Sequence, residues 1–463
     1  MNKKINITYG DEKITLLVPK DFLAGEVIKP RESSPLMSEE EMKKKIEESL
    51  QKPINSKKLN EIVKNKKVGL LINDGFRPGL QKLIVEVMLR EIFKGKPLSL
   101  KVFIATGTHN PEVYGRGIAE FIKRRAEEMN KEVFVITNDC EKGEFIYLGE
   151  TPFGTKAEVL KEWLETDSRI YAHESKYHYM NGYSVFDKQV CPGLSSWRTI
   201  ESTHKHALRE DLSAPGRIPY HKVRERQRNP FAEDNRYVRL LSERYVLKDG
   251  KLKEENPPVF LLDMISTPFT IKWIASGDPE IVSREMTEVV DKLSSFEIPR
   301  TKYVVISPGG PPFSDTLYGT QICLDMALKN AIEEGGEALI LAPCKGDPNL
   351  PLEVRGLGPS EKVKELFWDN LVRLRKLSLQ EATEWIKKNF ELYLWKTDRL
   401  LKFMLKQKVK LYLYSELPRE KIEPGGFLFV EDPNEWIKER AKRRDGKLRI
   451  IDEGNKVLIM SSK

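Results

Sequence analysis

Asp74, His109 and His178 are residues whose types suit acid–base chemistry, and each lies within a few residues of the end of a short apolar run. Apolar runs of this kind are typical of buried strands. In open α/β sheets, ligands bind beyond the carboxyl ends of the strands. A carboxylate gathered with imidazoles at such an edge can give and take protons near neutral pH. The sequence therefore predicts an acid–base site there.

Each of these residues also has an ordinary structural interpretation. Asp74 could cap the helix that begins near Gly79, and Arg77 could be a surface residue. Asn110-Pro111 resembles a helix N-cap with proline at the first position, which would make Gly107-Thr108 a simple turn. The alternative for Gly107 and Thr108 is a phosphate-binding turn, because N–H groups before a helix N-terminus bind anions.

The densest group of polar residues lies between positions 178 and 206. By position alone, Lys188 is expected to be a surface lysine. His204 and His206 could bind a metal together, because alternate residues of an extended chain share a face. No third histidine or cysteine stands close by in the sequence. One of the two could therefore be a ligand while the other is solvated.

The elements that position these residues follow the pattern of an α/β protein. Short apolar runs alternate with segments of helical periodicity; the predicted strands are 68–72, 100–105, 133–137 and 169–172, and the predicted helices are 80–92 and 118–129. This alternation implies a parallel sheet with helices on both faces. It resumes after a charged, irregular stretch at 181–258. We therefore predict two α/β domains with mainly parallel sheets, 1–270 and 271–463, and an active site in the crevice between them. The short strands predicted near the C-terminus suggest no function beyond packing.

Composition excludes several classes of protein. The 463 residues carry 78 basic and 70 acidic side chains, a formal charge of +8, but the two signs are interleaved and no nucleic-acid motif is present, so we expect no nucleic-acid partner. No apolar run approaches the ~18 residues of a membrane span. The N-terminus lacks an apolar signal segment, and the four cysteines show no disulfide or CxxC spacing. These features predict a soluble cytoplasmic protein.

Taken together, the motifs resemble the nickel-dependent lactate racemase family. They follow the family's order and spacing over roughly residues 70–325. The matching motifs are Asp74-x-x-Arg77-Pro78, Ala105-Thr106-Gly107-Thr108-His109, His178-x-x-x-Gly182-Tyr183-Ser184-x-x-x-Lys188, Pro192-Gly193, His204, Asn229-Pro230, Glu233-Asp234, Ser307-Pro308-Gly309-Gly310 and Leu317-Tyr318.

The resemblance implies a cofactor, the nickel-pincer nucleotide (pyridinium-3,5-bisthiocarboxylic acid mononucleotide). In this family two sulfur arms and a ring carbon of the nucleotide hold nickel. The resemblance implies that Lys188 tethers the cofactor through a thioamide and that His204 completes the nickel coordination. Asp74, Gly107 and Thr108 would lie near the cofactor, and Asp74 would also orient one of the catalytic histidines.

The resemblance further implies a racemase or epimerase of a 2-hydroxy acid. Removing the Cα hydrogen as hydride gives a planar 2-oxo acid, and returning it to the other face inverts the centre. His109 and His178 would be the paired acid/base residues, one for each enantiomer, while Arg77 and Tyr318 would hold the substrate. The expected partners are the 2-hydroxy acid and, transiently, the proteins that make the cofactor.

Two departures from the family pattern bear on the substrate and on the cofactor. Val185-Phe186-Asp187 stands where family members usually carry Gly-Gly-Arg before the lysine. Gly319 and Ile322 stand where lactate racemases place glutamine and lysine against the substrate carboxylate. We therefore expect a 2-hydroxy acid larger than lactate. One alternative is a degenerate member that binds a nucleotide or sugar-acid ligand without catalysis; another keeps the cofactor but performs a different hydride rearrangement or a net oxidoreduction.

Overall fold

The chain forms two compact units, one made of Met1–Arg31 with Leu293–Lys463 and the other of Glu32–Lys292. The computed structural model describes residues 2–31, 34–76, 79–209 and 228–461. This division differs from the predicted domains of 1–270 and 271–463. The N-terminal residues belong with the C-terminal unit. The segment after residue 270 stays in the other unit, because β14 (Thr270–Gly277) pairs antiparallel with the strand before it.

The unit formed by Glu32–Lys292 is built on a six-stranded sheet in the order β14-β13-β8-β3-β4-β5. All pairings except β13 with β14 are parallel. The predicted apolar runs correspond to its strands; their bounds are β3 (Lys67–Asn73), β4 (Ser99–Ala105), β5 (Phe134–Thr137), β8 (Ser168–Glu174) and β13 (Val259–Thr267). Since these strands run in one direction, their carboxyl ends, and the polar residues that follow them, lie at one edge of the sheet.

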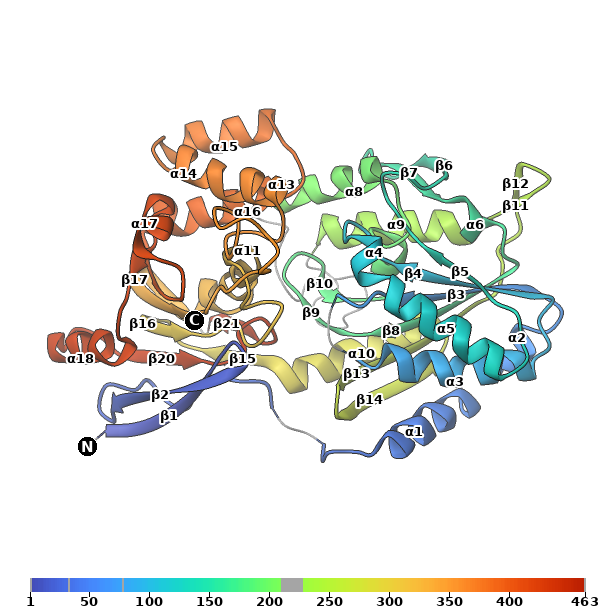
Figure 1. Cartoon of the computed structure of the whole chain (residues 1–463), viewed down its shortest axis with the longest axis horizontal. Helices are drawn as coiled ribbons and strands as arrows, with labels where there is room; N and C mark the ends of the chain where they lie inside the picture. Colours follow the sequence, from blue (N-terminus) through green and yellow to red (C-terminus); the bar gives the residue numbers. More distant parts are fainter. Residues whose placement is uncertain (1, 32–33, 77–78, 210–227, 462–463) are drawn as a thin grey trace. The chain divides into compact units, whose positions relative to one another are not determined.

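Helices cover both faces of this sheet, which explains why its strands are continuously apolar. The buried side chains of α1 (Glu39–Gln51), α3 (Gln81–Lys94) and α5 (Arg116–Glu128) form one core cluster with the strands. In Figure 1, α8 (Trp197–His204) and α9 (Pro230–Arg244) lie on the opposite side of the sheet from α1 and α3. The remaining elements are α2 (Leu59–Ile62), α4 (Pro111–Tyr114), β6 (Phe145–Glu150), β7 (Lys156–Leu160), α6 (Lys161–Leu164), β9 (Lys176–His178), β10 (Gly182–Ser184), α7 (Asp187–Val190), η1 (Lys205–Leu208), β11 (Tyr245–Lys248), β12 (Lys251–Glu254) and α10 (Pro279–Ser294).

The second unit contains a five-stranded parallel sheet in the order β19-β18-β17-β16-β20. Its strands are β16 (Thr301–Ile306), β17 (Ile332–Leu341), β18 (Lys410–Tyr414), β19 (Leu428–Phe429) and β20 (Leu448–Ile451), with β15 (Ser295–Ile298) and β21 (Leu458–Ser461) paired separately. Its main helices are α11 (Leu317–Cys323), α15 (Leu379–Lys388), α16 (Leu394–Leu401) and α18 (Pro433–Arg443). Shorter helical segments are η2 (Leu324–Leu328), α12 (Lys329–Ala331), α13 (Glu361–Lys364), η3 (Glu365–Asp369), α14 (Asn370–Leu374), η4 (Lys402–Lys406), α17 (Arg419–Ile422) and η5 (Glu423–Gly425).

The N-terminal hairpin of β1 (Asn2–Tyr9) and β2 (Glu12–Pro19) packs on this second sheet. Alternation of apolar and polar residues predicts the hairpin, and the structure confirms it. Its inward side chains, Ile5, Ile7, Leu16 and Val18, share a core cluster with β16, β17 and β20. Among the described residues, no helix is long and apolar enough to cross a membrane.

Candidate active site at the carboxyl edge of the first sheet

Asp74 and His109 form a contact across neighbouring strands. Asp74 follows β3 and is buried, and its Oδ2 lies 2.6 Å from Nδ1 of His109, which follows β4. A carboxylate accepts, so the Nδ1 that faces it carries the proton and Nε2 keeps its lone pair. Phe76 stacks on the imidazole with ring centroids 4.1 Å apart, which holds the plane of the ring. His109 is therefore arranged as a base.

Gly107 and Thr108 form the turn between β4 and His109. Gly107 has φ +56°, and its N–H donates to the carbonyl of Gly193 at 3.2 Å. A Cβ at Gly107 would come within 3.3 Å of Pro192, so the close approach of the two loops requires glycine there. Gly107 is buried and Thr108 half-buried. The turn thus joins the loop after β4 to the chain that follows Lys188.

His178 is the last residue of β9, and its ring has the opposite tautomer to that of His109. Its Nδ1 accepts the backbone N–H groups of Met180 at 3.2 Å and of Asn181 at 3.0 Å. The proton must then sit on Nε2, which makes His178 a donor. The imidazole is buried and stacks against Tyr179 at 4.4 Å between centroids. The two predicted catalytic histidines therefore have opposite tautomers: Nε2 of His109 can accept a proton, and Nε2 of His178 can donate a hydrogen bond.

Lys188 lies on α7, a single turn of helix held by its neighbours. Its N–H donates to the carbonyl of Val185, and its own carbonyl accepts from the N–H of Gly193, both at 3.0 Å. Gln189, the next residue, donates to the carbonyl of Ala172 at the end of β8. Lys188 itself is half-buried. Lys188, the residue predicted to tether the cofactor, therefore lies at the carboxyl edge of the sheet.

His204 ends α8 and is neutral at neutral pH. Burial lowers the pKa of His204 to about 4, and the positive charges of Lys188 and His206 act in the same direction. Its Nδ1 donates to the carbonyl of Ile200 at 2.7 Å, so the lone pair is on Nε2. Phe231 packs edge-on against the ring at 4.9 Å. A neutral imidazole with one nitrogen fixed by a carbonyl is the form that binds a metal ion.

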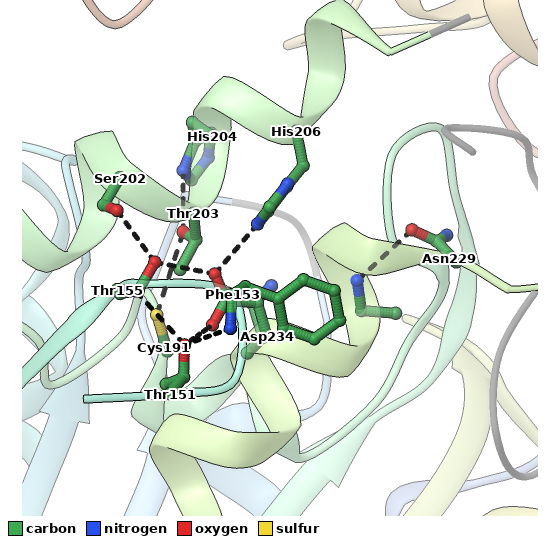
Figure 2. Close-up of polar contacts among 12 residues, drawn as sticks. Thr151, Phe153, Thr155, Cys191, Ser202, Thr203, His204, His206, Asn229 and Asp234 are labelled. Atoms are coloured by element: carbon green, nitrogen blue, oxygen red, sulfur yellow. Dashed lines mark hydrogen bonds and ion pairs between the residues drawn. The ribbon is translucent and has the colours of Figure 1, made fainter. Parts of the chain in front are cut away.

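Asp234 holds the chain around His204 in place, and Figure 2 shows it between Thr151, Thr155 and His206. Its carboxylate is fully buried and accepts from Thr151 at 2.6 Å, from Thr155 at 2.7 Å and from Nε2 of His206 at 2.9 Å. Thr155 also contacts the hydroxyl of Ser202 on α8 at 2.8 Å. His206 is thereby engaged by Asp234 rather than set beside His204 as a second ligand.

Among the described residues, no group of three or more His, Cys, Asp or Glu side chains could hold a metal ion. The donor chemistry nevertheless suits the predicted cofactor, because a nickel ion held mainly by nucleotide sulfur needs only one imidazole from the protein. His204 offers that imidazole, and the charge of Lys188 acts on it. The residues present therefore fit the nickel-pincer nucleotide.

The remaining predicted site residues are Arg77 and Tyr318. Arg77 is outside the described residues. Tyr318 begins α11 in the second unit, where Lys396 of α16 lies over its ring, with the ammonium 3.5 Å from the centroid, and donates to its carbonyl. Lys396 is 1% exposed. No motif in the sequence points to Lys396, which follows Tyr318 by 78 residues along the chain.

Comparisons with known proteins agree with the predicted resemblance. Residues 9–216 match the family described as "Lactate racemase N-terminal domain". The chain is 23% identical over 462 residues to the lactate racemase of Thermoanaerobacterium thermosaccharolyticum, covering 98% of this chain and 99% of that protein. It is also 23% identical over 346 residues to the lactate racemase of Lactiplantibacillus plantarum, covering 73% and 74% respectively.

Two solved structures share the fold. The lactate racemase apoprotein from Thermoanaerobacterium thermosaccharolyticum matches with a TM-score of 0.79 at 20% identity, over 99% of this chain and 100% of that one. A crystal structure of a protein from Thermotoga maritima matches with a TM-score of 0.59 at 16% identity, over 93% and 100%. The predicted α/β class with mainly parallel sheets is confirmed. The predicted resemblance is confirmed as well. The two lactate racemases that the chain resembles in sequence are isomerases.

Proposed function

We propose that this chain, which resembles lactate racemases over its whole length, is a racemase or epimerase that inverts C2 of a 2-hydroxy acid. The observation that carries this proposal is a pair of imidazoles with opposite tautomers. His109 keeps a lone pair on Nε2 because Nδ1 faces Asp74, and His178 keeps a proton on Nε2 because Nδ1 accepts two N–H groups. Inversion needs a group that takes the hydroxyl proton and, once protonated, returns it. Nε2 of His109 can do this, while the Nε2–H of His178 can donate a hydrogen bond to the substrate.

The cofactor proposed for the reaction is the nickel-pincer nucleotide. When bound, it supplies the acceptor for the hydrogen at C2. Lys188 would tether it, His204 would bind its nickel through Nε2, and Gly107 and Thr108 would line its binding site. Support for this assignment comes from the low pKa of His204, about 4, which burial and the charges of Lys188 and His206 produce and which leaves the ring neutral.

The proposed substrate is a 2-hydroxy acid larger than lactate. Gly319 and Ile322 offer no side chain that could bind a carboxylate, so the carboxylate contact of lactate racemases cannot be made from these positions. The proposal assigns this contact to Tyr318 together with Arg77. A charge-assisted hydrogen bond to a carboxylate contributes roughly 1.5–3 kcal/mol.

The experiment that tests the cofactor assignment is peptide mass spectrometry. The protein is produced together with the cofactor-synthesis proteins, and the peptide that contains Lys188 is searched for an adduct of nickel and sulfur. A Lys188→Arg variant, which keeps the charge but cannot form the amide, is the matched control. An adduct on the wild-type chain alone is expected, followed by a chiral screen of 2-hydroxy acids.

The result that contradicts the assignment is equally clear. If Lys188 stays unmodified while a known lactate racemase is loaded in parallel, the chain does not carry the cofactor. The alternative, a family member that binds a nucleotide or sugar acid without catalysis, would then lead. If the adduct forms and the product is a 2-oxo acid rather than a stereoisomer, the reaction is a net oxidation and the racemase assignment is wrong.

A further inference from the structure

The turn that fixes the tautomer of His178 joins two very short strands. β9 and β10 have three residues each, and His178 pairs with Gly182 across the hairpin that they form. A two-stranded hairpin of this size is only marginally stable by itself. Contacts from other elements are therefore needed to hold the N–H groups of Met180 and Asn181 towards Nδ1 of His178.

Three buried asparagines supply these contacts. Nδ2 of Asn229, the residue before α9, donates to the carbonyl of Met180 at 2.8 Å. Nδ2 of Asn235 donates to Oδ1 of Asn181 at 3.1 Å. Nδ2 of Asn181 in turn donates to the carbonyl of Tyr183 at 2.9 Å. All three asparagines are 0% exposed, so the first part of α9 and the turn are joined by hydrogen bonds shielded from water.

Asn229 uses the two ends of its amide for different contacts. Its Oδ1 accepts from the N–H of Ala232 at 3.2 Å and so caps α9 (Figure 2). Exchanging the oxygen and nitrogen would set oxygen against the carbonyl of Met180, so the partners fix the orientation of the amide. Aspartate or serine caps a helix as well as asparagine does. The cap therefore does not account for the buried amide nitrogen, which donates to Met180.

The carbonyl of Met180 and the N–H of Asn181 belong to the same peptide unit. A trans peptide unit is planar, and its C=O and N–H point in opposite directions. Asn229 holds the oxygen on one side, and on the other side the N–H is directed at Nδ1 of His178, 3.0 Å away. If this unit turned over, a carbonyl would face Nδ1, and only a protonated Nδ1 could form a hydrogen bond with it. The orientation of the peptide unit thus bears directly on which ring nitrogen carries the proton.

We propose that Asn229 is a positioning residue for His178: by binding the carbonyl of Met180, its amide maintains the Nε2–H tautomer of the imidazole. The inference rests on the proposed function of His178, whose Nε2–H donates a hydrogen bond to the substrate. It also gives the Asn229-Pro230 motif a second function besides starting α9. Asn229 acts through the peptide unit, whereas His178 acts on the substrate.

The tautomer of His178 can be measured in the full-length apoprotein. The protein is labelled with the NMR-active isotope of nitrogen in its histidine side chains, and proton–nitrogen correlation spectra distinguish a protonated from an unprotonated ring nitrogen. Spectra are recorded at about pH 8.5, where an ordinary imidazole is neutral. The chain has six histidines, and the signal lost in a His178→Gln variant identifies His178. The wild-type protein should carry the proton on Nε2.

The test variants are Asn229→Ser and Asn229→Asp. Both keep an oxygen that can cap α9, and both remove the amide donor. In each, a His178 signal with the proton on Nδ1 should appear, and the ratio of this form to the Nε2–H form should rise about fivefold or more, the factor expected for the loss of one hydrogen bond. Only Asn229→Asp introduces a charge, so the same shift in both variants assigns the effect to the lost donor.

Two further substitutions are matched controls. Asn110 caps α4 through its side chain, so Asn110→Ser repeats the exchange of a capping asparagine at another helix. Asn138→Ser removes an equally buried amide that donates to the carbonyl of Gly193 at 3.0 Å. Neither should change the tautomer of His178.

The inference is overturned if either Asn229 variant keeps the wild-type tautomer, or if a control shifts it as far as the Asn229 variants do. The spectra need neither cofactor nor substrate, so their outcome does not depend on whether the chain is a racemase. The proposed function is tested separately. A loaded Asn229→Ser enzyme with a shifted tautomer and full activity would contradict the function of His178 and leave the contact from Asn229 standing.

Discussion

His109 and His178 differ in what faces Nδ1, and this difference decides which imidazole can accept a proton. A carboxylate faces Nδ1 of His109, whereas two backbone N–H groups face Nδ1 of His178. The pairing of Asp74 with His109 could be predicted from the sequence, because both follow neighbouring parallel strands. The tautomer of His178 could not, since it depends on the tight turn between β9 and β10.

At the residue scale, the pKa of His204 leads to a prediction of pH dependence. In the folded apoprotein burial, with the charges of Lys188 and His206, lowers this pKa from 6.5 to about 4. Between these values the unfolded chain binds a proton that the folded chain does not, so acid favours unfolding. The apoprotein should therefore lose stability as pH falls from 6.5 towards 4, and a His204→Gln variant should lack this part of the loss.

The measurement is urea unfolding of both apoproteins at pH 7.5 and pH 5. The free energy of unfolding of His204→Gln should fall less between the two pH values, by roughly 1 kcal/mol after allowing for partial exposure of the ring. Parallel pH dependence in the two proteins would contradict a neutral, buried His204. The variant should also bind no nickel when the cofactor is supplied.

Among the elements, the most instructive connection is the one that α9 makes with two distant parts of the chain. Its Asp234 reaches back to the β6–β7 hairpin and to His206, and its Arg239 reaches Asp187, 52 residues away in sequence. The sequence does not show which polar partners α9 meets. The partners are set by the path of the chain between elements, which local patterns do not encode.

Asp234 is expected to stabilise the elements that it connects. Replacing it with alanine removes three accepted hydrogen bonds and leaves Thr151, Thr155 and His206 without their buried acceptor. Breaking a buried charged network of this kind costs roughly 3–5 kcal/mol. Glu233→Ala is the matched control, because Glu233 pairs with Arg228 at the surface and such pairs contribute at most about 1 kcal/mol.

The check is the urea midpoint of each variant together with amide exchange in the β6–β7 hairpin. Asp234→Ala should lower the midpoint clearly and speed exchange near Thr155, whereas Glu233→Ala should change neither appreciably. Equal effects of the two substitutions would show that Asp234 does not organise this region. Asp234→Asn should fall between them, since its one amide oxygen can still accept from one of the two threonines.

At the scale of the whole molecule, each unit has its own core. The first core is formed by one face of the six-stranded sheet with α1, α3 and α5, and the second by the N-terminal hairpin with β16, β17 and β20. The strands of both sheets are visible in the sequence as apolar runs. The packing partner of the hairpin is not visible in the sequence, because Thr8 contacts Asp452, 444 residues further along the chain. Contacts at such separation leave no local pattern, and the predicted domain boundaries differ from the structural ones for this reason.

Separate cores predict separate responses to cavity-forming substitutions. Ile7 and Leu70 are both fully buried, Ile7 in the core that the hairpin completes and Leu70 in β3. Replacing either with alanine should cost roughly 2–5 kcal/mol. In hydrogen exchange, Ile7→Ala should speed the amides of β16 and β20 and leave β3 and β4 protected, whereas Leu70→Ala should do the reverse. If both variants speed exchange in the same strands, the two cores unfold as one cooperative body. If the hairpin contributed nothing to the core, β16 and β20 would stay protected in Ile7→Ala. The comparison therefore also tests whether the N-terminal residues are part of the core that the C-terminal strands form.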